Sequence, residues 1–418
     1  MSEYKKNIPH YRRDNCRLCL SENIEMAIDM EATALGDHYI NKDNLGVEQT
    51  TYPLDVYYCH ECGHMQVSDV IDPSIVYGNY LYETSHSLGL DAHFKNYAKD
   101  VVHKYSLSES DLVIDIGCND GTFLKEFKNN GCRVLGIDPL EETAKKNIAA
   151  GIDTIVTFFN KETANIIRKD YGSAKIITAN NVMANVDDMV DFVSGIRELL
   201  APDGIFIFET GYLVGLINNN VIDNIYHEHL SYFRVNPLIK FFENNGMKVI
   251  DIQDSPTKGG SIRGIVKMSA ASHGINKSVK TFYEAENNSQ FADIEKYKQF
   301  SEQMLKNKDK LNDILNELNG KNVGGFGASV GVTTLIYYWG LGDKIKVLYD
   351  DNPIRHGLYS PGYHLPVHSP DMMSNDEIDV LLIFAWRYVE PILSKHKALK
   401  KQVEKIILPL PAAELILK

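Results

Sequence analysis

The chain is poor in the residues that mark membrane, secreted and nucleic-acid-binding proteins. Only 6 of its 418 residues are cysteine and 2 are tryptophan. No apolar run reaches the roughly 20 residues that a membrane-spanning helix needs. Lysine and arginine number 43 against 56 aspartates and glutamates, which gives a net charge of −13. Phosphate backbones and anionic membranes bind clustered basic residues, so we expect neither nucleic acid nor a membrane as a partner.

Compartment and size follow from the same composition. The first residues, Met-Ser-Glu-Tyr-Lys-Lys-Asn, lack the apolar core of a secretory signal, and six cysteines in a chain this long make no disulfide scaffold. We therefore expect a cytoplasmic protein. Its hydrophobic content of 44% and charged content of 24% are typical of a globular chain, and its length predicts two or three domains.

Four of the cysteines form two pairs near the amino terminus. Cys16 and Cys19 make one Cys-x-x-Cys, and Cys59 and Cys62 make another. Two such pairs can surround a zinc ion with four thiolates, and a site closed by four protein ligands is structural. The alternative, a redox dithiol, needs one pair at a helix N-terminus. His64 is a minor alternative ligand, because it follows the second pair directly.

The apolar pattern divides the chain into three parts. Residues 1–75 hold the paired cysteines and form the predicted zinc-binding domain. Residues 76–270 alternate apolar runs with helical stretches, which predicts a doubly wound, Rossmann-like α/β domain. Residues 271–418 begin with a long bridging helix, which we expect to contain a break, and continue as a second Rossmann-like α/β unit. The predicted strands are Leu112–Ile116, Arg133–Ile137, Ala174–Thr178, Gly204–Phe208, Ile345–Tyr349, Val380–Phe384 and Lys405–Leu408, with a strand and turn at Asn322–Gly327.

A glycine turn follows the first strand of the central part. The turn, Gly117-x-x-x-Gly121, fits neither Gly-x-Gly-x-x-Gly nor a Walker motif, so a phosphate-cradling loop is disfavoured. Asp115 in the strand before the turn suits a ligand with an amino-acid tail. Asp138 ends the second strand, where nucleotide-binding domains hold ribose hydroxyls. The alternative is a tight turn in a domain that binds no nucleotide.

This arrangement resembles the S-adenosylmethionine site of class I methyltransferases. In that family the loop approaches the methionine part and the acid binds the ribose. A further segment, Ala179–Asn181, stands after a later strand, where such enzymes close over the sulfonium. The cofactor contacts that the resemblance implies are Asp115, Gly117, Cys118, Asn119, Asp138 and Asn180.

The segment Tyr226-His227-Glu228-His229 packs two imidazoles, a carboxylate and a phenol into four residues. Imidazole is the side chain whose unperturbed pKa lies nearest neutrality, so this cluster can move protons at physiological pH. Two alternatives remain from these residues alone. One is a surface turn with solvated histidines, and the other is a buried aromatic and histidine pair bonded to the backbone.

Taken together, these motifs resemble a specific family, the three-domain sugar C-methyltransferases that act on nucleotide-linked deoxy-4-ketosugars. The likeness runs over nearly the whole chain, and its most specific part is the histidine segment with its aromatic sequel. The stretches that carry it are the four cysteines, Tyr52–Leu54, Tyr80–Tyr82, Asp115–Gly121, Tyr226–Phe233, Gly259–Arg263 and Gly325–Ala328.

The resemblance implies an S-adenosylmethionine-dependent reaction at the carbon beside the 4-ketone. A base removes the proton of that carbon, donors stabilise the enolate, and the carbon takes the methyl group. It implies His229 as the base, oriented by Glu228, with Tyr226 near the keto oxygen. Tyr82 would close the sugar pocket, with Tyr80 as the less favoured candidate.

Further substrate contacts are implied at three positions. Ser261 and Arg263 would meet substrate hydroxyls or the diphosphate, since arginine offers a bidentate fork; for Arg263 a surface strand residue is the alternative. Asn185 stands where the family commonly has a histidine, and an amide cannot accept a proton at neutral pH. The base role therefore falls more heavily on His229. The segment Ala328–Thr334 lacks an expected lysine, which is compatible with a changed nucleotide or sugar.

Two other functions remain open. The first is methyl transfer to oxygen or nitrogen of a related nucleotide sugar, with His229 deprotonating a hydroxyl. The second is a non-enzymatic, zinc-containing scaffold, against which the cofactor loop and the histidine cluster both argue. The sequence leaves the oligomeric state open, with a monomer as one option.

Overall fold

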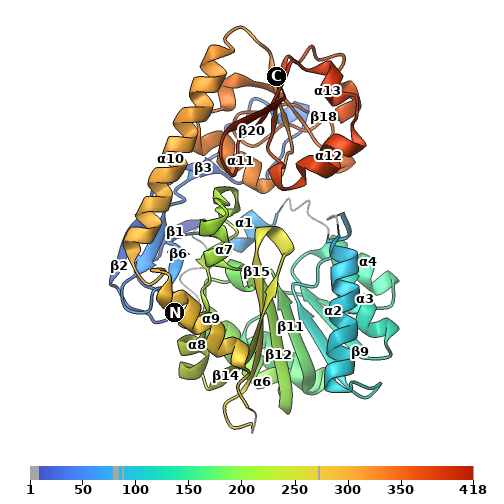
Figure 1. The fold of residues 1–418 in the computed structure, drawn as a ribbon. Coiled ribbons are helices and arrows are strands. Elements are labelled where there is room, and N and C mark those ends of the chain that lie inside the picture. The colour runs from blue at the N-terminus through green and yellow to red at the C-terminus, as the bar shows by residue number, and fades with distance from the viewer. Residues whose placement is uncertain (1–8, 79–83, 87–88, 272–273, 418) are drawn as a thin grey trace.

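The computed structural model describes residues 9–78, 84–86, 89–271 and 274–417. The carboxy-terminal unit lies above the central unit in Figure 1, and the amino-terminal strands lie beside them. Helix α10 (Ile294–Glu317) runs along one side, from strand β2 (Ile24–Ile28) of the amino-terminal part to the carboxy-terminal unit. Within the described ranges, no helix combines the length and apolarity needed to cross a membrane.

The amino-terminal part is made of short antiparallel strands, and one of its sheets takes a strand from far along the chain. That sheet has the order β13-β6-β5-β2, and β13 (Ser231–Tyr232) begins two residues after His229. A strand that closely follows the histidine segment therefore belongs to a sheet of the zinc-binding part. The other elements here are β1 (His10–Arg12), β3 (Thr33–Ala34), β4 (Thr51–Tyr52), β5 (Val56–Cys59), β6 (Met65–Val67), β7 (Asp69–Ile71) and α1 (Pro73–Val76).

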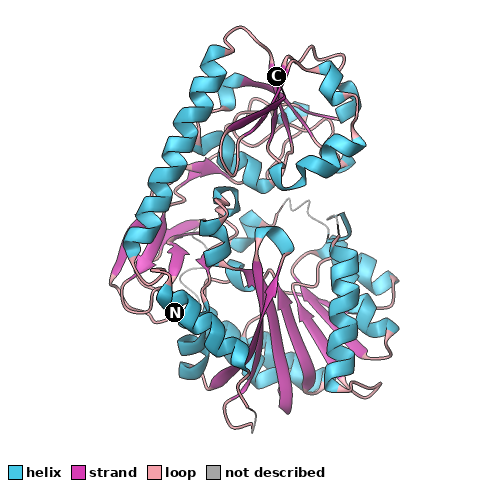
Figure 2. Ribbon diagram, in the orientation of Figure 1, coloured by secondary structure: helices cyan, strands magenta, loops and turns pink. Residues whose placement is uncertain are grey.

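The central unit is a seven-stranded sheet of order β10-β9-β8-β11-β12-β15-β14, in which β15 runs antiparallel to both of its neighbours. Helices cover both faces (Figure 2), so the inner strands are buried and mostly apolar, as parallel strands buried on two sides are. The strands are β8 (Leu112–Ile116), β9 (Arg133–Asp138), β10 (Asp153–Val156), β11 (Ala174–Asn180), β12 (Leu200–Gly211), β14 (Met247–Ser255) and β15 (Ser261–Met268).

The helices of the central unit alternate with these strands. They are α2 (Leu90–Tyr105), α3 (Thr122–Asn129), α4 (Glu141–Ala149), α5 (Lys161–Tyr171), α6 (Met189–Leu199), α7 (Leu213–Asn218) and α8 (Val235–Asn244). Short 3-10 helices used below are η3 (Met183–Asn185), η4 (Ile222–Asn224) and η5 (Thr257–Gly259).

The carboxy-terminal unit is a six-stranded sheet of order β18-β17-β16-β19-β20-β21, parallel except for β21. The predicted break in the bridging helix is confirmed, since α9 (Lys277–Asn288) ends before α10 begins, and α9 packs on β14 of the central sheet. The remaining elements are β16 (Val323–Phe326), β17 (Ile345–Tyr349), β18 (Val367–His368), β19 (Val380–Ile383), β20 (Lys405–Leu408), β21 (Glu414–Leu417), α11 (Val330–Tyr338), α12 (Val389–Lys395) and α13 (Leu399–Gln402).

The predicted fold class, a zinc-binding domain and two Rossmann-like α/β units, is confirmed.

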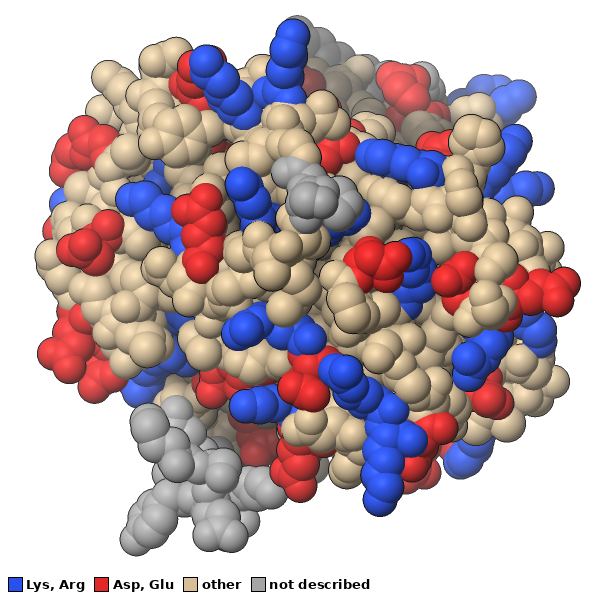
Figure 3. Space-filling model, turned by 90° about the horizontal axis from the view of Figure 1, so that it is seen from below, with Lys and Arg blue, Asp and Glu red and all other residues tan. Residues whose placement is uncertain are grey.

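On the face of the molecule that is seen from below, basic and acidic side chains are interspersed (Figure 3).

Candidate active site

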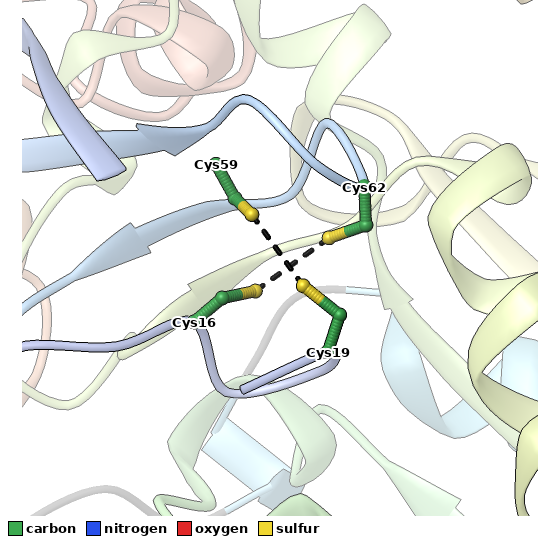
Figure 4. A group of neighbouring side chains, drawn as sticks. All are labelled: Cys16, Cys19, Cys59 and Cys62. Carbon is green, nitrogen blue, oxygen red and sulfur yellow. Dashed lines mark hydrogen bonds between the residues drawn. The ribbon is translucent and has the colours of Figure 1, made fainter. Parts of the chain in front are cut away.

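The four paired cysteines converge on one point (Figure 4). Their sulfur atoms all lie within 4.8 Å of one another, with 3.5 Å between the Sγ atoms of Cys16 and Cys62 and 3.5 Å between those of Cys19 and Cys59. A zinc ion with bonds of about 2.3 Å places tetrahedral sulfurs about 3.8 Å apart, so this donor set fits zinc. His64 is not a member of this donor group, and its Nε2 lies 3.2 Å from Ser231 Oγ.

A cavity of about 340 Å³ opens at the carboxyl ends of β8, β9 and β11. This is the edge at which parallel α/β sheets bind ligands. Its lining includes the six residues for which sequence reasoning implies cofactor contacts, namely Asp115, Gly117, Cys118, Asn119, Asp138 and Asn180.

Gly117 cannot be replaced without disturbing the cavity wall. Its φ is +69°, and a Cβ atom would lie 2.3 Å from Cγ2 of Val182. Only glycine combines this conformation with such a close approach. The missing side chain therefore lets the turn lie against Val182 in the cavity wall.

The two aspartates of the cavity are differently held. Asp115 Oδ1 accepts a 2.6 Å hydrogen bond from Thr178 Oγ1, and burial raises the pKa of Asp115 to about 7. Asp138 accepts backbone N–H bonds from Asn119 (2.8 Å) and Leu140 (3.0 Å), and burial raises its pKa as well. A carboxylate has about four acceptor positions, so Asp138 can accept further donors from a ligand.

Two asparagine oxygens at the cavity lack a partner among the described residues. They are Asn180 Oδ1 and Asn185 Oδ1, both buried. Asn185 donates from Nδ2 to the hydroxyl of Tyr77 at 2.8 Å. Buried acceptors without partners are costly, so the cavity is suited to a ligand that brings N–H or O–H groups. The methyl donor, with its ammonium and ribose hydroxyls, fits that requirement.

His229 has both ring nitrogens engaged. Nδ1 lies 3.0 Å from the carbonyl oxygen of Asn224, and Nε2 lies 2.9 Å from the hydroxyl of Tyr226. A carbonyl only accepts, so Nδ1 carries the proton and Nε2 accepts from the phenol. Burial lowers the pKa of His229 to about 4, which keeps the ring neutral at pH 7.

These contacts correct the expected orientation of the histidine. The group that orients His229 is the Asn224 carbonyl and not Glu228, because the segment forms a turn, closed by a 2.9 Å bond from the His229 N–H to the Tyr226 carbonyl, in which both ring nitrogens of His229 contact other groups. Glu228 lines a second cavity of about 290 Å³ together with Asn185, whereas His229 lines a small one beside Asn181 and Lys258. His227 is buried and bonds to the backbone oxygen of Tyr52, at 3.1 Å.

Lys258 and Asn181 connect His229 to the cofactor cavity, because both residues line the two spaces. Sequence reasoning missed Lys258 and named Asn181 only as part of the segment Ala179–Asn181. Both have left-handed backbone conformations, with φ of +50° and +55°. The available signals were the Gly259-Gly260 turn after Lys258 and the paired asparagines after β11.

The predicted substrate contacts in β15 are otherwise engaged. Ser261 is fully buried and donates its hydroxyl to the Thr257 carbonyl at 3.0 Å, so the expectation that it faces substrate is wrong. Arg263 pairs with Glu209 at 2.8 Å and stacks on the ring of Tyr97, 3.3 Å from its centroid. Neither residue lines any of the three cavities described.

Tyr82 and Tyr80, the predicted lids of the sugar pocket, lie outside the described residues. Their role stays a prediction.

All three parts of the chain hold the histidine segment. From the carboxy-terminal unit, Thr334 Oγ1 donates to the carbonyl of Ile225 at 2.8 Å and Arg387 pairs with Asp223 at 3.0 Å. From the amino-terminal part, Arg17 donates to the carbonyl of Leu230 at 3.0 Å. The candidate site is therefore a junction of three domains.

Comparison with known families covers the same three parts. Residues 16–77 match the family "Putative zinc binding domain", residues 90–252 a methyltransferase domain, and residues 256–411 the C-methyltransferase C-terminal domain. In this order the three matches are the domains of a three-domain C-methyltransferase. They confirm a methyltransferase that uses S-adenosylmethionine and carries a zinc-binding domain.

The relatives of this C-methyltransferase match different lengths of its chain. It is 29% identical to the C-methyltransferase NovU of Streptomyces niveus, over 96% of this chain and 97% of that protein. It is 23% identical to the mitochondrial ubiquinone biosynthesis O-methyltransferase of Bos taurus, over 33% of this chain and 41% of that protein. The long match thus includes all three domains, whereas the short one is confined to about a third of the chain.

Two solved structures can each be aligned with about half of this C-methyltransferase chain. An S-adenosylmethionine-dependent methyltransferase from Clostridium acetobutylicum has 13% identity and a TM-score of 0.35, covering 47% of this chain and 96% of its own. Magnesium protoporphyrin IX methyltransferase from Synechocystis has 15% identity and a TM-score of 0.34, covering 46% and 90%.

Proposed function

We propose that this enzyme methylates the carbon beside the ketone of a nucleotide-linked deoxy-4-ketosugar. The observation that carries the proposal is the neutral imidazole of His229, held by Tyr226 and Asn224 beside the cofactor cavity. The whole-length match to a C-methyltransferase supports it. A cytoplasmic location, where nucleotide sugars are made, accords with this role.

The cofactor residues have separate tasks in this proposal. S-adenosylmethionine supplies an electrophilic methyl group. The buried oxygens of Asp115 and Asn180 would receive the ammonium of its amino-acid tail, and Asp138 would accept from the ribose hydroxyls. The Gly117 turn, which has no side chain, would leave room for the part of the cofactor between its ammonium and its ribose.

His229 takes the proton. When the ketone binds, the Tyr226 hydroxyl turns its hydrogen from Nε2 to the keto oxygen; the Nε2 lone pair then accepts the proton that leaves the substrate carbon, and the electron pair of that C–H bond becomes the enolate. The Nδ1–H bond to the Asn224 carbonyl stabilises the imidazolium that forms. Protonated Nε2 then donates to the oxygen of Tyr226, which frees the phenol hydrogen for the enolate oxygen. Removal of the proton and stabilisation of the charge are thereby coupled in one pair of side chains.

Glu228 and Asn185 contribute from the second cavity. Both line it, next to Tyr77. As an acceptor and a donor they would hold sugar hydroxyls while the ketone faces Tyr226. Because Asn185 cannot act as a base, the substrate proton has His229 as its acceptor.

Solvent exchange tests this proposal. The enzyme, with S-adenosylhomocysteine in the cofactor site and a nucleotide-linked 4-ketosugar in D₂O, should incorporate one deuterium at the carbon beside the ketone. His229→Gln should abolish the incorporation. If the wild type methylates the sugar with no exchange under any condition, proton removal from carbon is not part of the reaction.

Transfer to oxygen or nitrogen is the second candidate. Asn185 favours it, since the site lacks the histidine that related C-methyltransferases commonly carry there. Under that alternative His229 deprotonates a hydroxyl and carbon-bound hydrogen does not exchange.

A further inference from the structure

Arg17 lies inside the first zinc knuckle, between the ligands Cys16 and Cys19, and none of its surface is exposed. Its backbone N–H donates to Gln66 Oε1 at 2.8 Å. Its guanidinium donates to the carbonyls of Val67 and Leu230 and, from Nε, to Asp187 Oδ1 at 3.2 Å. The side chain of a knuckle residue therefore leaves the zinc site and enters the central unit.

The partners of Arg17 belong to two walls of the candidate site. Leu230 directly follows His229, and its own N–H bonds to the carbonyl of Ala184 in η3 at 2.7 Å. Asp187 lines both the cofactor cavity and the second cavity. One guanidinium thus fixes the backbone next to the base and a carboxylate of the cofactor wall.

Packing alone does not require an arginine here. A buried guanidinium must be matched donor by donor, and an apolar side chain of similar volume fills such a space at no electrostatic cost. What arginine adds is direction, because its rigid planar fork holds several acceptors in one fixed arrangement. Four thiolate bonds to one metal fix the backbone from which this fork projects.

We propose that Arg17 is a positioning residue, through which the zinc knuckle sets the place of His229 relative to the cofactor wall. The inference rests on the proposed function for the identity of the base, but the contacts themselves do not depend on it. Zinc in this enzyme would then support turnover as well as stability. Its effect on turnover would pass through the side chain of Arg17 to the backbone next to His229.

Arg13 provides a matched control. It donates to the same carboxylate, from Nη1 to Asp187 Oδ1 at 3.0 Å, and also to the Asp187 carbonyl. The contact to Leu230 is made by Arg17. Comparing Arg17→Lys with Arg13→Lys therefore separates the effect at the cofactor wall from the effect at His229.

The kinetic experiment uses both variants, with the nucleotide-linked 4-ketosugar that the wild type converts fastest. Arg17→Lys should lower kcat by about tenfold or more, since small displacements of a reacting group have effects of this size. Zinc content should stay at the wild-type level, and the affinity for S-adenosylmethionine should change no more than in Arg13→Lys. Equal kcat values for the two variants would overturn the proposal, and so would loss of zinc in step with activity.

Hydrogen exchange tests the same claim without turnover. In Arg17→Lys the amides of residues 228–232 should exchange about tenfold faster, while those of β12 keep the wild-type rate. If Arg17→Lys does not fold, hydrogen exchange in the wild-type protein tests the proposal. Under mild denaturant, residues 228–232 should open together with the knuckle at residues 15–20, and opening together with β12 instead would refute the coupling. If the wild type converts no ketosugar, the proposed function fails, and exchange still decides the role of Arg17.

Discussion

His229 is held between a phenol and a carbonyl, and the two contacts give its nitrogens different tasks. Nδ1–H faces a group that can only accept, so the ring lone pair is on Nε2, where it accepts from the Tyr226 hydroxyl. The ring centroids of His229 and Tyr226 are 4.0 Å apart, which leaves no room for a solvent layer between them. A partly buried, neutral imidazole of fixed tautomer is prepared to accept one proton at one atom.

Removing this imidazole should stop the reaction and spare cofactor binding. His229→Ala should lower kcat by about 10²- to 10⁴-fold, the usual contribution of a general base. The dissociation constant for S-adenosylmethionine, measured by calorimetry, should stay close to the wild-type value. Tyr226→Phe, which keeps the ring and loses the hydroxyl, should have a smaller effect on kcat. Rapid turnover by His229→Ala would remove it as the base.

The backbone at Gly117 gives a second residue-scale prediction. Gly117→Ala should weaken S-adenosylmethionine binding by about tenfold or more, because the new Cβ meets Val182 and the φ of +69° strains any L side chain. Gly172→Ala is the matched control, since its φ is +89° but nothing lies within 4 Å of the added atom. Calorimetric titration of both variants should separate crowding from strain. Equal affinities would show that the turn does not shape the cofactor site.

Single residues differed in how far the sequence could identify them. Asp115 and Asp138 end adjacent parallel strands, and this position alone brings them to one cavity. The side to which Glu228 points could not be inferred from the sequence. An irregular segment lacks the regular repeat that, in a helix or strand, shows which residues share a face. Lys258 was missed and Ser261 was misjudged for a related reason, since the 3-10 turn η5 decides which of them faces the cavities.

At the scale of elements, helix α8 depends on a carboxylate from another helix. Glu286 of α9 accepts the N–H groups of Val235 (2.6 Å) and Asn236 (2.9 Å), which begin α8. It also lies 3.7 Å from the buried guanidinium of Arg234. An acceptor at a helix N-terminus satisfies otherwise unpaired donors and opposes the positive end of the helix dipole.

Glu286→Ala should therefore destabilise the protein strongly. Loss of the carboxylate leaves buried N–H groups and a buried cation unmatched, at a cost of about 3 to 5 kcal/mol. Glu284→Ala, an exposed position of the same helix that faces Lys280, should change stability by about 0.5 kcal/mol or less. Urea unfolding monitored by circular dichroism measures both. Coincident unfolding curves for the two variants would contradict the capping role.

Elements were predictable where burial is continuous. All five residues of β8 are buried, and the largely apolar run in the sequence predicted this strand. Strand β10 at the sheet edge has no fully buried residue, and β13 has only two residues, so neither produces a periodic signal. The pairing of β13 with β6 joins residues about 165 positions apart, a contact that no local pattern encodes.

For the whole molecule, buried ionisable groups should make stability depend on pH in opposing ways. Burial lowers the pKa of His227 to about 4 and raises that of Asp115 to about 7. Between pH 6.5 and 4 the unfolded histidine binds a proton that the folded one refuses, so acid removes stability. Between pH 7 and about 4 the folded aspartate holds a proton that the unfolded one has lost, so acid adds stability.

Substitutions should separate these two contributions. The stability of the wild type relative to His227→Gln should fall as the pH is lowered from 6.5 to 4. Relative to Asp115→Asn it should rise as the pH is lowered from 7 to 4. Unfolding free energies at several pH values, without cofactor, provide the measurement. A difference that does not vary with pH for either variant would show that the group titrates normally in the fold.

The central claim is that the methyl group is bonded to carbon. The most direct measurement is the carbon NMR spectrum of the product formed from ¹³C-methyl S-adenosylmethionine and a panel of nucleotide-linked deoxy-4-ketosugars. The account predicts a labelled methyl carbon coupled to a ring carbon next to the ketone. A labelled methyl attached to oxygen or nitrogen would contradict it.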